Sequence, residues 1–164
     1  MIECRVPDPE AQLVFGASLA KHLPSRLVLY LEGDLGTGKT TLARGLLAGL
    51  GYRGAVRSPT YTLLEPYELA GARLYHLDLY RLADPRELDY LGLRDLLGED
   101  AIWVVEWPER GSGVLPHADL RITMEYAANG RRLRLSAETP SGQAVLDTLA
   151  VERPNGARNC ALCE

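Results

Sequence analysis

The chain has 164 residues, 46% of them hydrophobic and 24% charged, which suits one globular domain that buries about two-thirds of its unfolded surface. No apolar run approaches the roughly 18–20 residues that span a bilayer, and residues 1–5 open no signal peptide, so we expect a cytoplasmic protein. The formal net charge of −4 argues against a chain that binds nucleic acid by itself, because that affinity depends on many contacts with phosphates.

The first predicted elements are a strand over residues 3–6 and a helix from Pro9 to about His22. Asp8 is placed to cap this helix, because an aspartate side chain accepts hydrogen bonds from the free N–H groups of a first turn. Pro9 suits the first helical position. A second strand is expected over residues 27–32, where β-favouring apolar residues lead into a glycine-rich loop.

Residues 33–40, GDLGTGKT, match the phosphate-loop pattern G-x-x-x-x-G-K-[ST] at every fixed position. A helix is expected over 40–50, so the loop has the strand before it and the helix after it that phosphate binding requires. We expect Lys39 to reach the β- and γ-phosphates of a nucleoside triphosphate, and the Thr40 hydroxyl to bind Mg²⁺. A glycine-rich turn before an ordinary helix is the alternative. The nucleotide-binding residues predicted here are Gly33, Asp34, Leu35, Gly36, Thr37, Gly38, Lys39, Thr40 and Thr41.

Two β-rich runs, 61–69 and 73–80, are joined by residues 70–72 and predict a hairpin. Thr60, in a Ser-Pro-Thr segment just before them, would sense the γ-phosphate as switch threonines do. The same segment is also typical of an ordinary turn.

Period-two alternation within the second run places His76, Asp78 and Tyr80 on one face of the strand. Such a cluster would orient the attacking water or help to hold the water shell of the metal. Asp78 is therefore a candidate catalytic residue, and Tyr80 a candidate contact near the nucleotide or a partner. The alternative is the solvated face of an edge strand.

A further helix start is predicted at Asp84, supported by Glu87, and short helical pieces run from there to Gly98. Residues 101–105 form a continuous apolar run, typical of a strand buried on both faces of a parallel sheet. Glu106 follows directly. Because a phosphate loop needs a second acid at the end of a neighbouring strand, we expect Glu106 to bind Mg²⁺ and to be catalytic, with a structural ion pair as the alternative.

Trp107 follows this acid and would lie near the nucleotide or a partner surface, with core packing as the equal alternative. Apolar and polar residues then alternate on both sides of Asn129-Gly130, which predicts a second hairpin. On its return strand, Arg132 and Arg134 would lie on a solvated face. Arg131 points to the other side and is a candidate contact with the nucleotide.

A last helix is expected over residues 143–150. The elements together predict an α/β fold, a P-loop NTPase-like three-layer sandwich with a mixed sheet flanked by helices, as one ATPase domain over residues 1–150. Residues 151–164 are expected to form a flexible tail. Its Cys160 and Cys163 form a C-x-x-C pair, which is half a zinc site, a redox pair or simply a reduced pair on a loose tail.

ATP is favoured over GTP, because the chain lacks the Asn/Thr-Lys-x-Asp element of guanine-specific proteins; Lys21 and Lys39 are its only lysines. Two other functions share the loop. One is a small-molecule kinase, for which Arg110 is the candidate lid arginine. The other is a nucleotide-dependent binding switch with negligible turnover.

Several motifs together resemble the bacterial TsaE family, the ATPase component of tRNA threonylcarbamoyladenosine biosynthesis. The resemblance covers roughly residues 5–137. Its motifs are 33–41 (GDLGTGKTT), 58–67 (SPTYTLLEPY), 75–82 (YHLDLYRL), 104–109 (VVEWPE) and 115–120 (LPHADL).

The resemblance implies an ATPase that works with the TsaB and TsaD components, which modify adenosine 37 of tRNAs reading ANN codons. It implies that Thr40 and Glu106 ligate Mg²⁺, that Lys39 holds the phosphates of ATP, and that Asp78 acts in hydrolysis. Thr60 and Trp107 would lie near the nucleotide and the partner surface. The tRNA would be bound through the complex.

Overall fold

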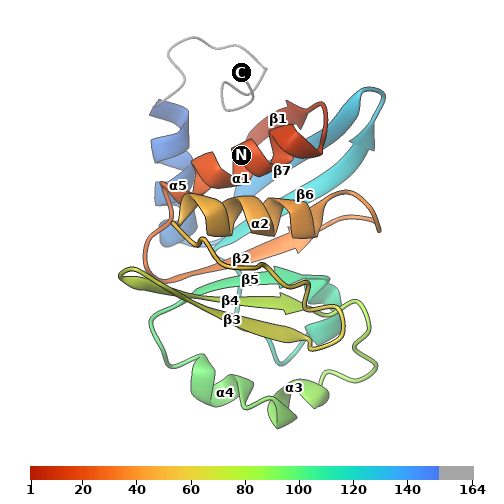
Figure 1. Ribbon diagram of the computed structural model, residues 1–164, viewed down its shortest axis with the longest axis vertical. Coiled ribbons are helices and arrows are strands. Elements are labelled where there is room, and N and C mark those ends of the chain that lie inside the picture. The colour runs from red at the N-terminus through yellow and green to blue at the C-terminus, as the bar shows by residue number, and fades with distance from the viewer. Residues whose placement is uncertain (152–164) are drawn as a thin grey trace.

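Seven strands form one mixed sheet in the order β1-β7-β6-β2-β5-β4-β3 (Figure 1). The computed structural model describes residues 1–151. Strand β2 runs parallel to β5 and β6, and β4 runs parallel to β5, whereas the remaining neighbours are antiparallel. The strands are β1 Ile2–Val6, β2 Leu27–Glu32, β3 Leu64–Leu69, β4 Ala72–Asp78, β5 Ile102–Glu106, β6 Leu120–Ala127 and β7 Gly130–Ala137.

Helices cover both faces of this sheet, which confirms the predicted α/β sandwich with a mixed sheet (Figure 1). Helices α1 and α2 pack with α5 over one apolar cluster, and α3, α4 and the segment after β5 cover a second cluster on the other face. The helices are α1 Pro9–Ala20, α2 Lys39–Gly49, α3 Glu87–Tyr90, α4 Leu93–Leu96, the 3-10 helix η1 Pro108–Gly111 and α5 Pro140–Val151. None of the helices described is both long and apolar enough to cross a bilayer.

Helices α1 and α2 approach each other closely because glycines face each other at their crossing. A Cβ at Gly16 would lie 2.6 Å from the Leu42 carbonyl oxygen, and one at Gly45 would lie 2.4 Å from that of Leu13. Larger residues at these positions would force the two helices apart. The close crossing places α1 beside the loop that opens α2.

The predicted strands and helices are present, but several boundaries differ from the predictions. Helix α1 ends at Ala20 rather than near His22, and α5 begins at Pro140, three residues early. Strand β3 begins only at Leu64, because Leu63 adopts a left-handed backbone conformation with φ of 64°. Local sequence signals place the ends of elements poorly, since caps and tertiary contacts decide them.

Two further turns also differ from the predictions. In the second hairpin the turn residues are Ala128 and Asn129, and Gly130, with φ of 104°, already opens β7. After β4, Glu87 accepts from the Asp84 N–H at 2.9 Å as expected, but the Asp84 side chain accepts from the Arg86 N–H, and regular helix begins only at Glu87 with Arg86 as its N-cap. The predictions for the tail, including Cys160 and Cys163, lie outside the described residues.

Candidate functional site

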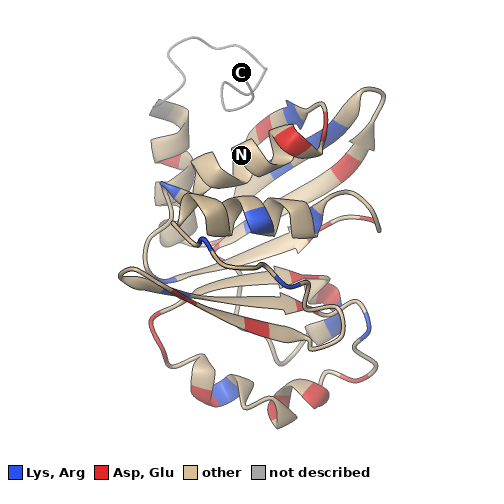
Figure 2. Cartoon of the chain, in the orientation of Figure 1, with Lys and Arg blue, Asp and Glu red and all other residues tan. Residues whose placement is uncertain are grey.

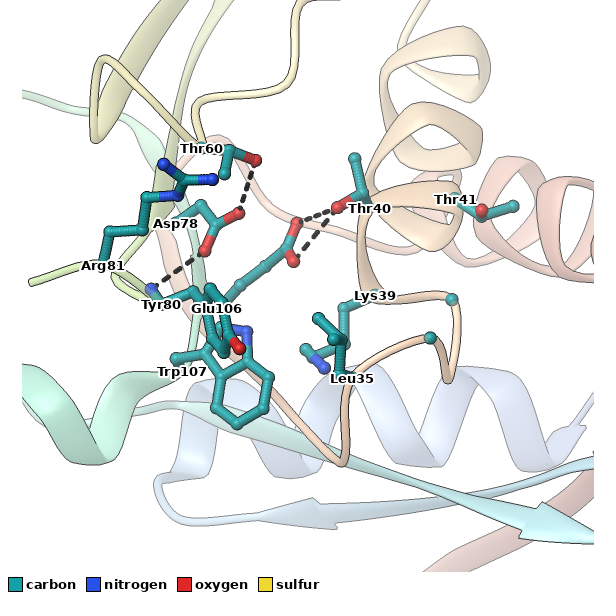
Figure 3. Close-up of a pocket in the computed structure, with 12 residues that line it drawn as sticks. Leu35, Lys39, Thr40, Thr41, Thr60, Asp78, Tyr80, Arg81, Glu106 and Trp107 are labelled. Carbon is teal, nitrogen blue, oxygen red and sulfur yellow. Dashed lines mark hydrogen bonds between the residues drawn. The ribbon is translucent and has the colours of Figure 1, made fainter.

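A cleft of about 510 Å³ opens where the loop after β2 meets the carboxyl ends of β4 and β5 (Figure 3). Segments far apart in the sequence build it: the glycine loop with the start of α2, the turn before β3, and the residues that follow β4 and β5. The residues that line it are Leu35, Gly36, Gly38, Lys39, Thr40, Thr41, Thr60, Asp78, Tyr80, Arg81, Glu106 and Trp107. Most of the predicted site residues therefore meet at one place.

The glycine loop has a backbone that only glycine adopts without strain. Gly33, Gly36 and Gly38 have φ of 144°, 79° and 98°. Gly38 also has no room for a side chain, because a Cβ there would lie 2.2 Å from Oε1 of Gln12. Since Gly38 is the N-cap of α2, the first N–H groups of that helix meet no capping side chain and are free to bind an anion.

Gln12, on α1, supports this loop and was not predicted from the sequence. Its side chain is buried, and Nε2 donates a hydrogen bond of 2.7 Å to the Thr37 carbonyl oxygen. The Thr37 hydroxyl in turn donates to the Asp34 carbonyl oxygen. The sequence offers no signal for Gln12, because only the close crossing of α1 and α2 brings it to the loop.

Lys39 is buried and faces the carbonyl oxygens of its own loop. Its Nζ donates to Gly33 at 2.6 Å and to Asp34 at 2.8 Å, and it lies 4.2 Å from the centre of the Trp107 ring. Burial lowers the pKa of Lys39 from its ordinary value, although the carboxylates of Glu106 and Asp78 oppose this effect. The ammonium group is thus held at the mouth of the loop.

Thr40 and Glu106 form a pair of oxygen donors at the centre of the cleft (Figure 3). The Thr40 hydroxyl donates to both carboxylate oxygens of Glu106, at 3.0 and 3.1 Å, and Glu106 is only 2% exposed. Hydroxyl and carboxylate oxygens suit Mg²⁺. Within residues 1–151 no group of three His, Cys, Asp or Glu side chains is arranged to hold a metal alone. The donor set therefore fits an ion that also takes oxygens from phosphate and water.

Glu106 also contacts a histidine of the same chain, so a structural interaction of the kind considered as the alternative is present. Nε2 of His76, on β4, lies 2.8 Å from Oε1 of Glu106, and the His76 side chain is fully buried. Metal binding by Glu106 stays a prediction.

Asp78 ends β4 directly beside Glu106, which ends β5, because the two parallel strands pair in that register. It accepts hydrogen bonds from the Thr60 hydroxyl at 3.2 Å and the Tyr80 N–H at 3.0 Å. Burial raises the pKa of the Asp78 carboxyl above its ordinary value, the Tyr80 N–H opposes this, and the nearby charge of Glu106 adds to it. The edge-strand alternative is wrong, because β3 lies outside β4 and Asp78 is only 5% exposed.

Trp107 stands between the glycine loop and the residues after β4 (Figure 3). Its backbone is left-handed, with φ of 56°, and its ring lies 5.0 Å from that of Tyr80. The guanidinium of Arg110 lies above both rings, at 5.3 Å from Tyr80 and 5.9 Å from Trp107. Arg81, which was not predicted, also lines the cleft, and its guanidinium lies over the ring of Tyr61.

The arginines of β7 have different surroundings. Arg131 reaches the outer side of the glycine loop, where it donates to the Gly36 carbonyl oxygen at 3.3 Å and lies 4.3 Å from the centre of the Tyr126 ring. It does not line the cleft, and its contact with a nucleotide stays a prediction. Arg132 and Arg134 pair with acidic residues of the neighbouring strands, as a solvated strand face implies. In Figure 2 charges of both signs are interspersed over this part of the sheet.

A strand, a glycine loop and a helix, with an acid at the end of the neighbouring parallel strand, define a P-loop NTPase-like α/β protein.

Comparison with known proteins gives the family. The family model for threonylcarbamoyl adenosine biosynthesis protein TsaE matches residues 6–133. Over 150 residues the chain is 45% identical to the tRNA threonylcarbamoyladenosine biosynthesis protein TsaE of Haemophilus influenzae, covering 88% of this chain and 95% of that protein. The protein of the same name from Bacillus subtilis is 35% identical over 131 residues, or 80% of this chain and 82% of the relative. The chain therefore belongs to the TsaE family.

The crystal structure of YdiB from Bacillus subtilis has a similar fold, with a TM-score of 0.79 and 28% sequence identity. The match covers 92% of this chain and 95% of that chain.

Proposed function

We propose that this chain is a Mg²⁺-dependent ATPase that serves the N6-threonylcarbamoylation of adenosine 37 in tRNAs reading ANN codons. In this proposal it works in the cytoplasm in a complex with the TsaB and TsaD components, and ATP hydrolysis supports or resets the transferase cycle. Membership of the TsaE family supports the pathway. The observation that carries the ATPase activity is the cleft in which Lys39, Thr40, Asp78 and Glu106 meet.

The glycine loop and the start of α2 would bind the phosphates of ATP. The free N–H groups at the start of α2 supply hydrogen bonds and the positive end of the helix dipole. Lys39 already lies at the mouth of the loop, where it donates to the Gly33 and Asp34 carbonyl oxygens, and its flexible chain would turn to the β- and γ-phosphates.

Thr40 and Glu106 would hold Mg²⁺, which when bound neutralises charge that develops on the phosphates. The carboxylate of Asp78 would accept a proton from the attacking water, or orient that water, from the neighbouring position at the end of β4. The Thr60 hydroxyl holds Asp78 at 3.2 Å and links it to the turn before β3. That link would let the turn respond to the γ-phosphate.

We expect the isolated chain to be slow. Arg81 lines the cleft from an exposed position, but its guanidinium lies over Tyr61, 4.4 Å from the ring centre. An arginine supplied by a partner typically raises the rate of phosphate-loop enzymes by about 10³–10⁵-fold. The acidic net charge fits a complex in which this chain hydrolyses ATP and its partners provide the surface that binds tRNA.

The test is steady-state phosphate release from Mg-ATP by the chain alone and with TsaB and TsaD. We expect stimulation by the partners, and loss of turnover by at least about a hundred-fold in Lys39→Ala and Glu106→Ala while thermal unfolding shows that both variants fold. Unchanged hydrolysis in both variants would remove the proposed site. Equal rates with and without the partners would separate the activity from the complex and make a kinase assay with metabolite acceptors the next step.

A further inference from the structure

His76 is a buried histidine that touches the proposed metal site without lining the cleft. It lies on β4, two residues before Asp78, and its side chain is 0% exposed. The lining of the cleft includes Asp78 and Glu106 but not His76. Because its Nε2 lies 2.8 Å from Oε1 of Glu106, His76 reaches the cleft only through that carboxylate.

Glu106 forms hydrogen bonds with Thr40 and His76, and the two bonds restrict the orientation of its carboxylate differently. The Thr40 hydroxyl lies 3.0 Å from Oε1 and 3.1 Å from Oε2, so it does not distinguish the two oxygens. His76 contacts Oε1 alone. The last torsion of a glutamate is broad, so a contact with one oxygen restricts the rotation of the carboxylate plane and sets the direction in which the other oxygen points.

The chemistry of the contact assigns the donor. An ionised carboxylate only accepts hydrogen bonds, so Nε2 of His76 carries a proton. Nδ1 is buried and meets no hydrogen-bond partner among the residues that the structure describes. The imidazole is therefore oriented by its bond to Glu106, and Glu106 by its bond to the imidazole.

We propose that His76 is a positioning residue that orients Glu106 toward Mg²⁺, an inference that rests on the ATPase function proposed above. The parallel register supports it, because Asp78 pairs with Glu106 while His76 pairs with Val104, two residues further from the cleft. His76 thus supports the carboxylate from within the sheet. The loss of such a supporting hydrogen bond typically weakens metal binding about 10–100-fold.

The experiment compares His76→Phe, which removes the donor but keeps a ring, with His76→Gln, whose amide nitrogen keeps a donor at a similar reach. Electron paramagnetic resonance measures the binding of Mn²⁺ to the ADP complex, and ADP binding is measured separately in EDTA. We expect His76→Phe to weaken Mn²⁺ binding about 10–100-fold, His76→Gln to recover most of it, and both to bind ADP as the unchanged chain does. Equal Mn²⁺ affinity in His76→Phe and the unchanged chain would overturn the proposal.

Tyr75→Phe is the matched control. Tyr75 is the preceding residue of β4, on the other face of the sheet, and its hydroxyl donates to the Glu99 carboxylate at 2.6 Å. This variant also loses a donor to a carboxylate from the same strand, yet Mn²⁺ binding should not change. An equal loss of Mn²⁺ affinity in Tyr75→Phe would assign the effect to a weakened β4 and would also overturn the proposal.

A second measurement needs no variant at His76. Long-range ¹H–¹⁵N spectra of the unchanged chain identify which ring nitrogen carries the proton; the proposal requires Nε2, with a signal that shifts in Glu106→Gln. A proton on Nδ1 alone would contradict the proposal even if the His76 variants do not fold. If the unchanged chain binds no Mn²⁺ with ADP, the ATPase function falls together with this inference, whereas normal binding that His76→Phe leaves intact removes only the role of His76.

Discussion

A carboxylate lies near each end of strand β4, Glu99 near the amino end and Asp78 at the carboxyl end, and the two have opposite surroundings. At the amino end, Glu99 receives the Tyr75 hydroxyl at 2.6 Å and is paired with Arg73. These hydrogen bonds lower the pKa of Glu99 below its ordinary value. At the carboxyl end, Asp78 lies beside Glu106, and burial raises the pKa of Asp78.

The difference lies in what surrounds each charge. Arg73 bonds directly to Glu99, and it also binds Glu68 on the neighbouring strand at 2.6 Å. The acids at the carboxyl end share one buried lysine, Lys39, whose own pKa is lowered by burial. Crowded carboxylates with few countercharges disfavour the folded state, and a bound cation relieves them. We therefore expect the acid at the amino end to stabilise the fold and the acids at the carboxyl end to serve the proposed cation site.

The largest effect is expected from Asp78→Asn, which removes a buried charge at the carboxyl end of β4. Asp78→Asn should lower ATP hydrolysis at least about a hundred-fold, because a general base contributes about 10²–10⁴-fold to a rate. It should also raise the midpoint of thermal unfolding in the absence of metal, because it removes a buried charge. Phosphate release and thermal unfolding at neutral pH measure the two effects.

Glu99→Gln is the counterpart at the amino end. It should lower the midpoint of unfolding, because Arg73 and Tyr75 lose their charged partner, and it should leave hydrolysis per folded molecule unchanged. Equal losses of hydrolysis in the Asp78 and Glu99 variants would contradict the division of β4 into a stabilising and a functional end.

The opposite pKa shifts predict opposite pH dependences of stability. For Asp78 the folded pKa is raised, so its contribution to stability is fully present below the unfolded value of about 3.8 and is lost as pH rises through the folded pKa. For Glu99 the folded pKa is lowered, so its contribution is present above the unfolded value of about 4.5 and is lost as pH falls through the folded pKa. Denaturant unfolding from pH 7 downward measures both.

The stability of the unchanged chain relative to Asp78→Asn should therefore increase as pH falls, whereas its stability relative to Glu99→Gln should decrease. Hydrolysis should decline on the acid side at a pH above the ordinary carboxyl pKa, because the role proposed for Asp78 requires the ionised carboxylate. The same sign of pH dependence for both variants would refute the assignment.

The smallest expected effect uses the two tryptophans of the chain, which lie on β5 and just beyond its carboxyl end. Trp103 is buried and stacks on Tyr75 with ring centres 4.5 Å apart, whereas Trp107 lies 4.2 Å from Nζ of Lys39. In the proposed function Lys39 turns toward the phosphates, so nucleotide binding should change the fluorescence of Trp107. In Trp103→Phe the change on adding ADP should persist, and in Trp107→Phe it should vanish. A fluorescence change that is lost in Trp103→Phe instead would contradict nucleotide binding at the carboxyl end of β5.

The sequence could predict the parts of the site that depend on neighbouring residues. The phosphate-loop pattern places Lys39 and Thr40 at the start of a helix, and a buried apolar run that ends in Glu106 predicts an acid at the end of a central strand. These predictions need only local periodicity and motif chemistry, and the structure brings the three residues to one cleft. The order of the strands makes that meeting possible, since β2 and β5 are neighbours.

Contacts between distant segments could not be predicted. Gln12 reaches the loop only because two glycines let α1 and α2 cross closely. The alternation along β4 left His76 and Asp78 equally consistent with a solvated edge and with a site, because a strand pattern does not say what lies beside the strand.

The sequence by itself determined the glycine loop, the strand and helix around it, and the acid at the end of the next parallel strand, because each depends on residue type and spacing along the chain. The tertiary structure decided that β3 pairs with the outer edge of β4, that the buried His76 contacts Glu106, and that Glu99 rather than Asp78 has an arginine partner. Burial and countercharge are properties of neighbours in space, and these set the charge state of a carboxylate.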